Sequence, residues 1–317
     1  MARPDSLDKY DEILHVRNIL SNRYLQGKDE AIYLCLTALV ANGHLLLEDI
    51  PGLGKTTLAL ALSRSLGLSF GRVQCTSDLL PSDITGLSIY DREEGHFKFL
   101  PGPIFNNVLL VDEINRATPK TQSALLEAME EMRVTVEGTT YPLPDPFLVI
   151  ATQNPVEQVG TYLLPESQLD RFMITTGIGY PSPEVEREII RGGSVREEIR
   201  KIEALVSLED IQAARQVVSE QIYLSEKILD YILKIVLATR DHQQILSGIS
   251  TRGGINLAQA ARAAAFLEGR SFVIPEDVKR VVMSVGAHRL LLRGQHESLE
   301  KEEVLQSIVE KIPVPLV

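Results

Sequence analysis

The chain has 317 residues, 44% of them apolar, and its 32 Lys and Arg against 43 Asp and Glu give a net charge of −11. This length suggests two domains, and the apolar fraction is sufficient for sizeable cores. The acidic surface would repel nucleic acid and anionic membranes over much of its area, which argues against a nucleic-acid motor. No apolar run approaches the roughly 18 residues that a membrane span requires.

The amino-terminal segment and the cysteines indicate the compartment. Residues Met1 to Tyr10 contain no apolar stretch, so the sequence predicts no signal peptide. Cys35 and Cys75 lie far apart and lack Cys-x-x-Cys spacing, which is typical of buried thiols in a reducing environment. We therefore expect a cytoplasmic protein.

The first half of the chain predicts a parallel sheet. Residues 5–41 have the pattern of two helices with a break at 24–27. From 43 to about 180, strand-like and helix-like segments alternate, as in a sheet with crossover helices. The expected strands cover 44–48, 69–74, 107–112, 146–151 and 172–178. Segments 86–100 and 132–144 have the pattern of hairpins inserted into this sheet.

The second half predicts helices almost throughout. Apolar residues three or four positions apart indicate helices near 208–218, 225–241, 251–269, 275–289 and 299–310. The predicted organisation is an α/β nucleotide-binding domain over 1–181 that includes the amino-terminal helices and both hairpins. A linker over 182–206 and an all-helical lid over 207–317 follow.

A phosphate-binding loop is predicted directly after the first strand. The stretch EDIPGLGKTT (48–57) follows Leu45-Leu46-Leu47 and precedes a helix-like run. Small residues allow backbone N–H groups to surround a polyphosphate at a helix start. The candidate ATP-binding residues here are Pro51, Gly52, Leu53, Gly54, Lys55, Thr56 and Thr57. Lys55 would reach the β- and γ-phosphates and the Thr56 hydroxyl would bind Mg²⁺. Asp49 stands where the usual pattern has glycine.

Two carboxylates end another apolar strand. Asp112 and Glu113 follow Val108 to Val111, roughly 55 residues after the phosphate loop. In phosphate-loop enzymes the strand beside the loop ends in an Asp that holds Mg²⁺ through water, and Asp112 fits this role. Glu113 is placed to orient the attacking water or to accept its proton. Taken alone, the two acids could simply mark a strand that ends in a polar turn. Their position after a phosphate-binding loop favours a functional role.

An amide follows a third apolar strand. Asn154 comes after Phe147 to Gln153, on a strand that an ATPase sheet places between the other two. At this tip Asn154 could hydrogen-bond the attacking water and sense the γ-phosphate. The alternative is a turn-forming Asn before Pro155, which is common. The other two motifs favour the functional interpretation.

With these motifs the chain resembles the MoxR family of AAA+ ATPases over nearly its whole length. The stretches that carry the resemblance are LEDIPGLGKT (47–56), LLPSDITG (79–86), DEINRA (112–117), KTQSALLEAM (120–129), ATQNP (151–155) and LPESQLDRF (164–172). Together they are far more specific than one phosphate loop. The implied fold is an AAA+ α/β module with a parallel sheet, followed by an all-helical lid, and the implied ligands are ATP and Mg²⁺.

The resemblance also implies roles for four further residues. Arg171 looks like the arginine finger, which reaches the ATP of a neighbouring subunit, and Arg252 looks like the second sensor arginine. The family more often has Ser-Pro-Arg and then a small residue, where this chain has STRGG (250–254). Leu25 and Gly27 lie in a segment similar to the one beside the adenine. Without the resemblance, Arg171 would be taken for a surface arginine paired with Asp170 or Glu166.

The function that the resemblance implies is ATP hydrolysis by a ring, most simply a hexamer. The expected work is chaperone-like remodelling of a protein client in complex maturation or metal insertion, with a partner that carries a von Willebrand factor A domain. The first alternative is a motor subunit of a metal chelatase. The chain resembles such subunits too, but more distantly than it resembles the MoxR family. A nucleic-acid motor is the second, although basic and aromatic residues do not alternate as in strand-binding proteins.

Two other classes fit less well. A non-enzymatic nucleotide-dependent scaffold would not need the full set of Lys55, Asp112, Glu113 and Arg171. A small-molecule kinase with a phosphate loop would not need a long helical lid and a finger-like arginine. The sequence therefore favours an ATPase, and no residue identifies the client.

Overall fold

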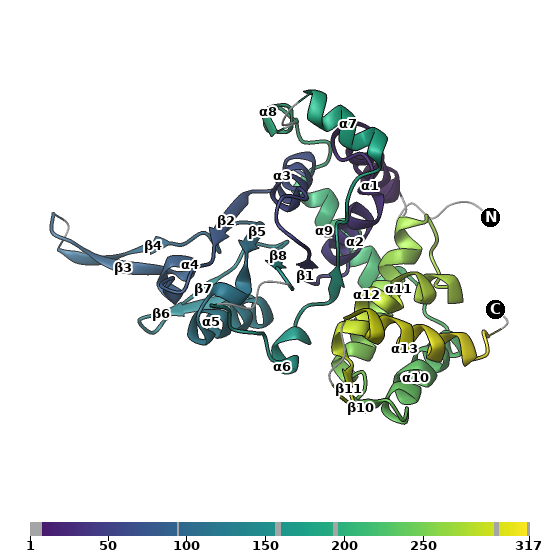
Figure 1. Ribbon diagram of the computed structural model, residues 1–317. Coiled ribbons are helices and arrows are strands. Elements are labelled where there is room, and N and C mark those ends of the chain that lie inside the picture. Colours follow the sequence, from purple (N-terminus) through teal and green to yellow (C-terminus); the bar gives the residue numbers. More distant parts are fainter. Residues whose placement is uncertain (1–7, 94, 156–159, 193–195, 295–297, 316–317) are drawn as a thin grey trace.

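The computed structural model describes residues 8–93, 95–155, 160–192, 196–294 and 298–315. The first described helices are α1 (Asp8–Ile19) and α2 (Asp29–Val40), separated by a π turn and a short loop, which confirms the predicted pair of helices and its break. Every residue from Ala31 to Val40 is buried. A helix that is apolar on all sides must be covered on all sides, and α2 accordingly lies at the centre of the molecule (Figure 1).

Five parallel strands form the central sheet, in the order β2-β5-β8-β1-β9. They are β1 (Leu45–Glu48), β2 (Phe70–Gln74), β5 (Val108–Asp112), β8 (Leu148–Gln153) and β9 (Ile174–Thr176), and all lie where the sequence predicts them. Glu48 is opposite Gln153, and Gln74 is opposite Asp112. The carboxyl ends of these strands therefore meet at one edge of the sheet.

Helices cover both faces of the sheet. Leu45 and Leu47 of β1 share a core cluster with α2 and with α3 (Lys55–Ser65), whereas Leu46 belongs to a second cluster with α5 (Pro119–Glu131). A parallel sheet that is buried on both faces needs such continuous apolar strands. The result is the predicted three-layer α/β module (Figure 1).

Both predicted hairpins are present. The first consists of β3 (Gly86–Asp91) and β4 (His96–Pro101), and the second of β6 (Arg133–Val136) and β7 (Thr139–Pro142). The first hairpin projects far from the rest of the molecule (Figure 1). Its apolar side chains Leu87, Ile89, Tyr90, Phe97 and Leu100 are exposed. Phe99 stacks on Tyr141 at a centroid distance of 4.0 Å, so the two hairpins touch near their bases.

The rest of the chain is mainly helical. Its elements are α4 (Pro81–Thr85) and α6 (Glu166–Leu169) within the module, then α7 (Pro183–Gly192), α8 (Arg196–Arg200), α9 (Leu208–Gln216), α10 (Glu226–Arg240), β10 (Ile245–Ser247), α11 (Thr251–Leu267), α12 (Pro275–Gly286), β11 (Leu291–Leu292) and α13 (Ser298–Lys311). The pair β10–β11 was not expected, because strands this short leave no periodic pattern. Within the described ranges, no helix has the length and apolar character to cross a bilayer.

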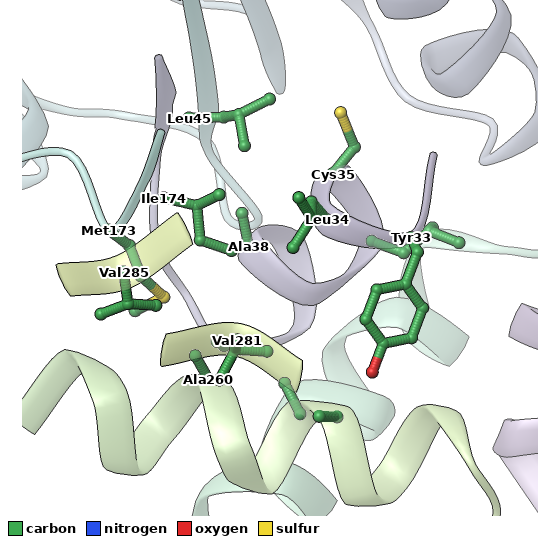
Figure 2. Packing of buried hydrophobic residues seen from close by; sticks show 14 of the residues in the cluster. Tyr33, Leu34, Cys35, Ala38, Leu45, Met173, Ile174, Ala260, Val281 and Val285 are labelled. Atoms are coloured by element: carbon green, nitrogen blue, oxygen red, sulfur yellow. The ribbon is translucent and has the colours of Figure 1, made fainter. Parts of the chain in front are cut away.

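The lid shares a core with the α/β module. Figure 2 shows Leu34 and Ala38 of α2 together with Ile174 of β9, Ala260 of α11 and Val281 of α12. All five side chains are buried. Because interiors are close-packed, a rotation of the lid would have to repack this cluster.

Helix α9 lies against the α/β module although it follows the predicted linker. It neighbours α1 and α2, and Gln212 Nε2 donates a hydrogen bond of 2.9 Å to the main-chain oxygen of Asp145. The predicted ends of the α/β domain at 181 and of the linker at 206 stay predictions. The start of the lid at 207 depends on whether α9 is assigned to the lid or to the α/β module.

A buried histidine fixes the amino end of β1. The His44 ring accepts a hydrogen bond at Nδ1 from the Val149 N–H (3.1 Å), and Nε2 lies 3.2 Å from the Met129 oxygen. The ring is therefore neutral and joins β1, β8 and α5. Burial lowers the pKa of His44 from 6.5 to about 4.

We expect acid to destabilise the protein through His44. The pKa is lowered in the folded state, so the unfolded chain takes up the proton first, and stability is lost as pH falls from 6.5 towards 4, by about 3 kcal/mol in full. Urea unfolding at several pH values, compared with His44→Asn, measures this difference. Burial also lowers the pKa of His288, but that residue is present in both proteins and cancels. Parallel stability curves would contradict the expectation.

Candidate functional site

The loop predicted to bind phosphate lies between β1 and α3, as expected. Gly52 and Gly54 have φ values of 92° and 95°, a left-handed conformation that favours glycine. Gly54 is the N-cap of α3, so the helix begins at Lys55. The first N–H groups of a helix have no partner within the helix and point outward with the positive end of its dipole. The turn can therefore bind an anion.

Lys55 lies close to the acidic strand end. Its Nζ donates a hydrogen bond to the main-chain oxygen of Asp49. Burial lowers the pKa of Lys55, while the nearby carboxylates of Asp49, Asp112 and Glu113 act in the opposite direction. The parallel register of the sheet thus brings the predicted lysine and the predicted acids to one edge.

Asp112 is a buried carboxylate at the end of β5. Arg72 Nε donates to its Oδ2 at 2.8 Å, and Thr152 Oγ1 lies 3.4 Å from Oδ1. Arg72 and Thr152 come from β2 and β8, the strands on either side. Nothing in the sequence marked them, because the neighbours of β5 are known only once the strand order is known.

Glu113 is held in an unusual backbone conformation. Its φ of 56° is left-handed, which is uncommon for a residue other than glycine and is found often at functional sites. Its N–H donates to Thr152 Oγ1 at 2.9 Å. Its carboxylate accepts from Gln74 Nε2 at 3.0 Å and pairs with Arg116 Nε at 3.1 Å. Gln74 and Arg116 are further site residues that sequence analysis missed.

Asn154 follows β8, which lies between β5 and β1 in the sheet. This confirms the expected strand position. Asn154 therefore stands at the same edge as Lys55, Asp112 and Glu113, between the acidic pair and the phosphate loop. The preceding Gln153 donates from Nε2 to Glu48, which ties the ends of β8 and β1 together.

The departure from the loop pattern at Asp49 has a structural reason. The Asp49 carboxylate accepts hydrogen bonds from the N–H of Ile178 and from the N–H of Gly179 (3.1 Å). The buried Lys28 donates from Nζ to the Gly179 oxygen. Burial lowers the pKa of Lys28, and the Asp49 carboxylate opposes this effect. Asp49 thus fastens the phosphate loop to the segment that follows β9.

The segment proposed for the adenine lies against the same region. Leu25 is buried and its N–H donates to the Leu20 oxygen at 2.8 Å. Gly27 has a φ of 73°, and a Cβ there would lie 3.9 Å from the Pro181 Cα. The structure therefore places Leu25 and Gly27 near the loop, linked to it through Lys28 and Asp49.

Arg171 and Arg252 lie together at the opposite edge of the sheet. Arg171 precedes β9 and Arg252 is in the first turn of α11. Both bind Glu130 on α5: Arg171 Nη1 lies 3.2 Å from Oε2, and Arg252 pairs with Oε1. They line an open pocket of about 240 Å³ that also includes His44, the residue before β1. The structure therefore does not bring Arg252 to the phosphate loop of its own chain.

The donor set at the loop fits MgATP. Mg²⁺ is commonly bound by one or two protein ligands together with substrate phosphates, rather than by a protein cage. Among the described residues, no group of three or more His, Cys, Asp or Glu side chains is placed to hold a metal. The Thr56 hydroxyl and the Asp112 carboxylate, beside a loop that can bind phosphate, are the set that Mg²⁺ with a nucleotide would require.

Comparison with known proteins agrees with this geometry. Residues 44–174 match the family model described as "ATPase family associated with various cellular activities (AAA)", and residues 237–312 match the AAA lid domain. The chain is 39% identical to the chaperone MoxR1 of Mycobacterium tuberculosis over 93% of this chain and 80% of that protein. It is 45% identical to the uncharacterized protein YeaC of Bacillus subtilis over 93% of this chain and 92% of that one.

A solved structure supports the same assignment. A candidate ATPase from Cytophaga hutchinsonii superimposes with a TM-score of 0.88 at 39% identity, over 98% of this chain and 97% of that one. The sequence relatives and the solved structure cover almost the entire chain, and the two family models match its α/β and lid segments. The chain belongs to the MoxR family of AAA+ ATPases.

Proposed function

We propose that this protein binds ATP with Mg²⁺ at the phosphate loop and hydrolyses it. The observation that carries the proposal is the meeting of Lys55, Asp112, Glu113 and Asn154 at one edge of the sheet. Lys55 and the N–H groups of the loop would bind the β- and γ-phosphates. Thr56 and Asp112 would hold Mg²⁺, which neutralises charge on the phosphates when bound.

Glu113 is the proposed base for the attacking water. Hydrogen-bonded carboxylates can orient a water and accept its proton, and Asn154 would hold the same water from the neighbouring strand. Gln74 and Arg116 donate to Glu113 in this structure. Both contacts are to Oε2, so Oε1 would bind the water while Gln74 and Arg116 hold the carboxylate in place.

The base assignment is tested with Glu113→Gln. This variant should bind ATP normally, because Lys55 and the loop are unchanged, yet turn it over at least about 100-fold more slowly. Lys55→Ala is the reference variant and should lose ATP binding. Fluorescent-nucleotide titration and phosphate release measure the two properties. Turnover near the wild-type rate in Glu113→Gln would place the base elsewhere.

The position of Arg171 and Arg252 supports a ring. Both lie at the edge of the sheet away from the phosphate loop, so they would serve the nucleotide of a neighbouring subunit. The Arg171 side chain is 31% exposed, so its guanidinium is accessible to an incoming group. A head-to-tail contact that closes on itself makes a ring, and we propose a hexamer.

Mixed rings test this arrangement. Arg171→Ala should bind ATP but lose most turnover, since an arginine finger contributes about 10³-fold or more. Mixing it with Lys55→Ala should restore part of the activity, because the second protein supplies intact arginines to the first. Mass measurement must show that the two variants assemble together. Co-assembled rings without recovered activity would rule out action between subunits.

The role of Asp49 yields a prediction that runs against the motif. Asp49→Gly restores the usual glycine but removes the acceptor for the N–H groups of Ile178 and Gly179. We expect ATP and ADP to bind about 10-fold more weakly, equivalent to about 1.4 kcal/mol. Asp49→Asn retains an acceptor oxygen and should lose less. Calorimetric titration would contradict the prediction if Asp49→Gly bound nucleotide as well as wild type.

For the work that ATP drives, we propose chaperone-like remodelling of a protein client. A relative with 39% identity over most of both chains is named a chaperone, and family resemblance suggests a partner with a von Willebrand factor A domain and a role in complex maturation or metal insertion. The net charge of −11 argues for a protein client over nucleic acid.

A further inference from the structure

A carboxylate that the lid holds precedes the proposed finger. Asp170 lies directly before Arg171, and its side chain is bound from two elements of the lid. Ser250 Oγ lies 3.1 Å from each carboxylate oxygen, and Arg289 Nε donates to Oδ1 at 2.7 Å. The lid thus holds the chain immediately beside Arg171.

Arg289 does more than pair with Asp170. It lies in the turn after α12, and its side chain is only 1% exposed. Its guanidinium also donates to the main-chain oxygens of Asp170 (3.1 Å), Phe172 (2.7 Å) and Met173 (3.2 Å). A planar guanidinium can make this set of bonds, whereas a lysine ammonium cannot match its geometry. One lid side chain therefore fixes the backbone on both sides of Arg171.

The same carboxylate fixes the start of α11. Ser250 is the N-cap of this helix, and its Oγ accepts from the Gly253 N–H at 3.0 Å. Because the Ser250 hydroxyl also binds Asp170, the first turn of α11 is attached to the segment that carries Arg171. Arg252 lies in that turn. Asp170 therefore contacts the segments that carry both arginines proposed to act on a neighbouring subunit, Arg171 and Arg252.

Gly253 leaves the space that this arrangement needs. A Cβ at Gly253 would lie 2.7 Å from Arg289 Cδ and 2.6 Å from Ile249 Cγ2, both too close. A Cβ at the neighbouring Gly254 would lie 3.4 Å from Val236 Cγ2, an ordinary contact. Of the two glycines in the STRGG stretch, only Gly253 must lack a side chain for Arg289 to pass beside it.

We propose that Arg289 and Asp170 form a positioning pair that aligns Arg171 and Arg252 as one unit for the nucleotide site of a neighbouring subunit. The proposal rests on the proposed function, namely that these arginines act between subunits. It assigns to the lid a role in the neighbour's reaction: the lid's place on its own module decides whether that module presents its arginines correctly.

The test is a matched pair of helix substitutions, Gly253→Ala and Gly254→Ala. Both introduce the same methyl group into the first turn of α11, but only the first displaces Arg289. We expect Gly253→Ala to bind ATP within about 2-fold of wild type and to turn it over about 10- to 100-fold more slowly, the range that small misplacements of catalytic groups produce. Gly254→Ala should turn over ATP as wild type does.

Mixing with Lys55→Ala gives the decisive readout. Gly253→Ala retains its own phosphate loop, so arginines supplied by Lys55→Ala subunits should restore its turnover, as they do for Arg171→Ala. A loss in Gly253→Ala that mixing leaves unchanged, while Arg171→Ala is rescued in parallel, would overturn the proposal. Equal turnover in the two glycine variants would overturn it as well.

Arg289→Lys gives an independent check that does not depend on steric displacement. It keeps the charge but loses the fork of hydrogen bonds, so it should also turn over ATP about 10-fold or more slowly, bind ATP normally and be rescued by Lys55→Ala. Wild-type turnover in Arg289→Lys would overturn the proposal. If Arg171→Ala itself is not rescued, the action of arginines between subunits fails, and the positioning role falls with it for that separate reason.

Discussion

All five strands of the sheet run parallel, and this constraint determines where every proposed site residue can lie. Residues that follow the strands, such as Lys55, Asp112 and Asn154, gather at one edge. Residues that precede the strands, such as Arg171, stand at the other edge. A strand of four residues spans about 13 Å, so the two groups of residues lie on opposite sides of the sheet within a single chain. The proposed division of the active site between subunits follows from the direction of the strands.

The lid is attached to the α/β module through two different kinds of contact. Apolar packing of α2 against α11 and α12 gives the lid its place, because such burial is strong but has little directional preference (Figure 2). The bonds from Arg289 to Asp170 and its neighbours then define the orientation, since hydrogen bonds depend on angle as well as distance. Packing therefore holds the lid on the module, and the buried Arg289 determines the orientation of the lid relative to Arg171.

The sequence predicted what depends on local pattern and missed what depends on neighbours. Apolar strands, helical period and the loop glycines all leave a trace within a few residues, so the sheet, the lid helices and the phosphate loop could be predicted. Gln74, Glu130 and Arg289 leave no such trace, because their partners are 39, 41 and 119 positions away. Asp49 was visible as a departure from the pattern, but its reason required knowing that the segment after β9 lies beside it.

Exposure separates the arginines that can move from the one that cannot. The side chains of Arg171 and Arg252 are 31% and 45% exposed, and ion pairs this accessible contribute at most about 1 kcal/mol, so exchanging Glu130 for phosphate oxygens costs little. Arg289 is almost fully buried, and breaking its pair with Asp170 would strand a charge at a cost of about 3–5 kcal/mol. A catalytic side chain must be free to exchange its partner for the nucleotide. The residue that positions it must stay fixed. Arg171 and Arg252 share one carboxylate, that of Glu130, which leaves a net positive charge suited to the phosphates of an incoming nucleotide.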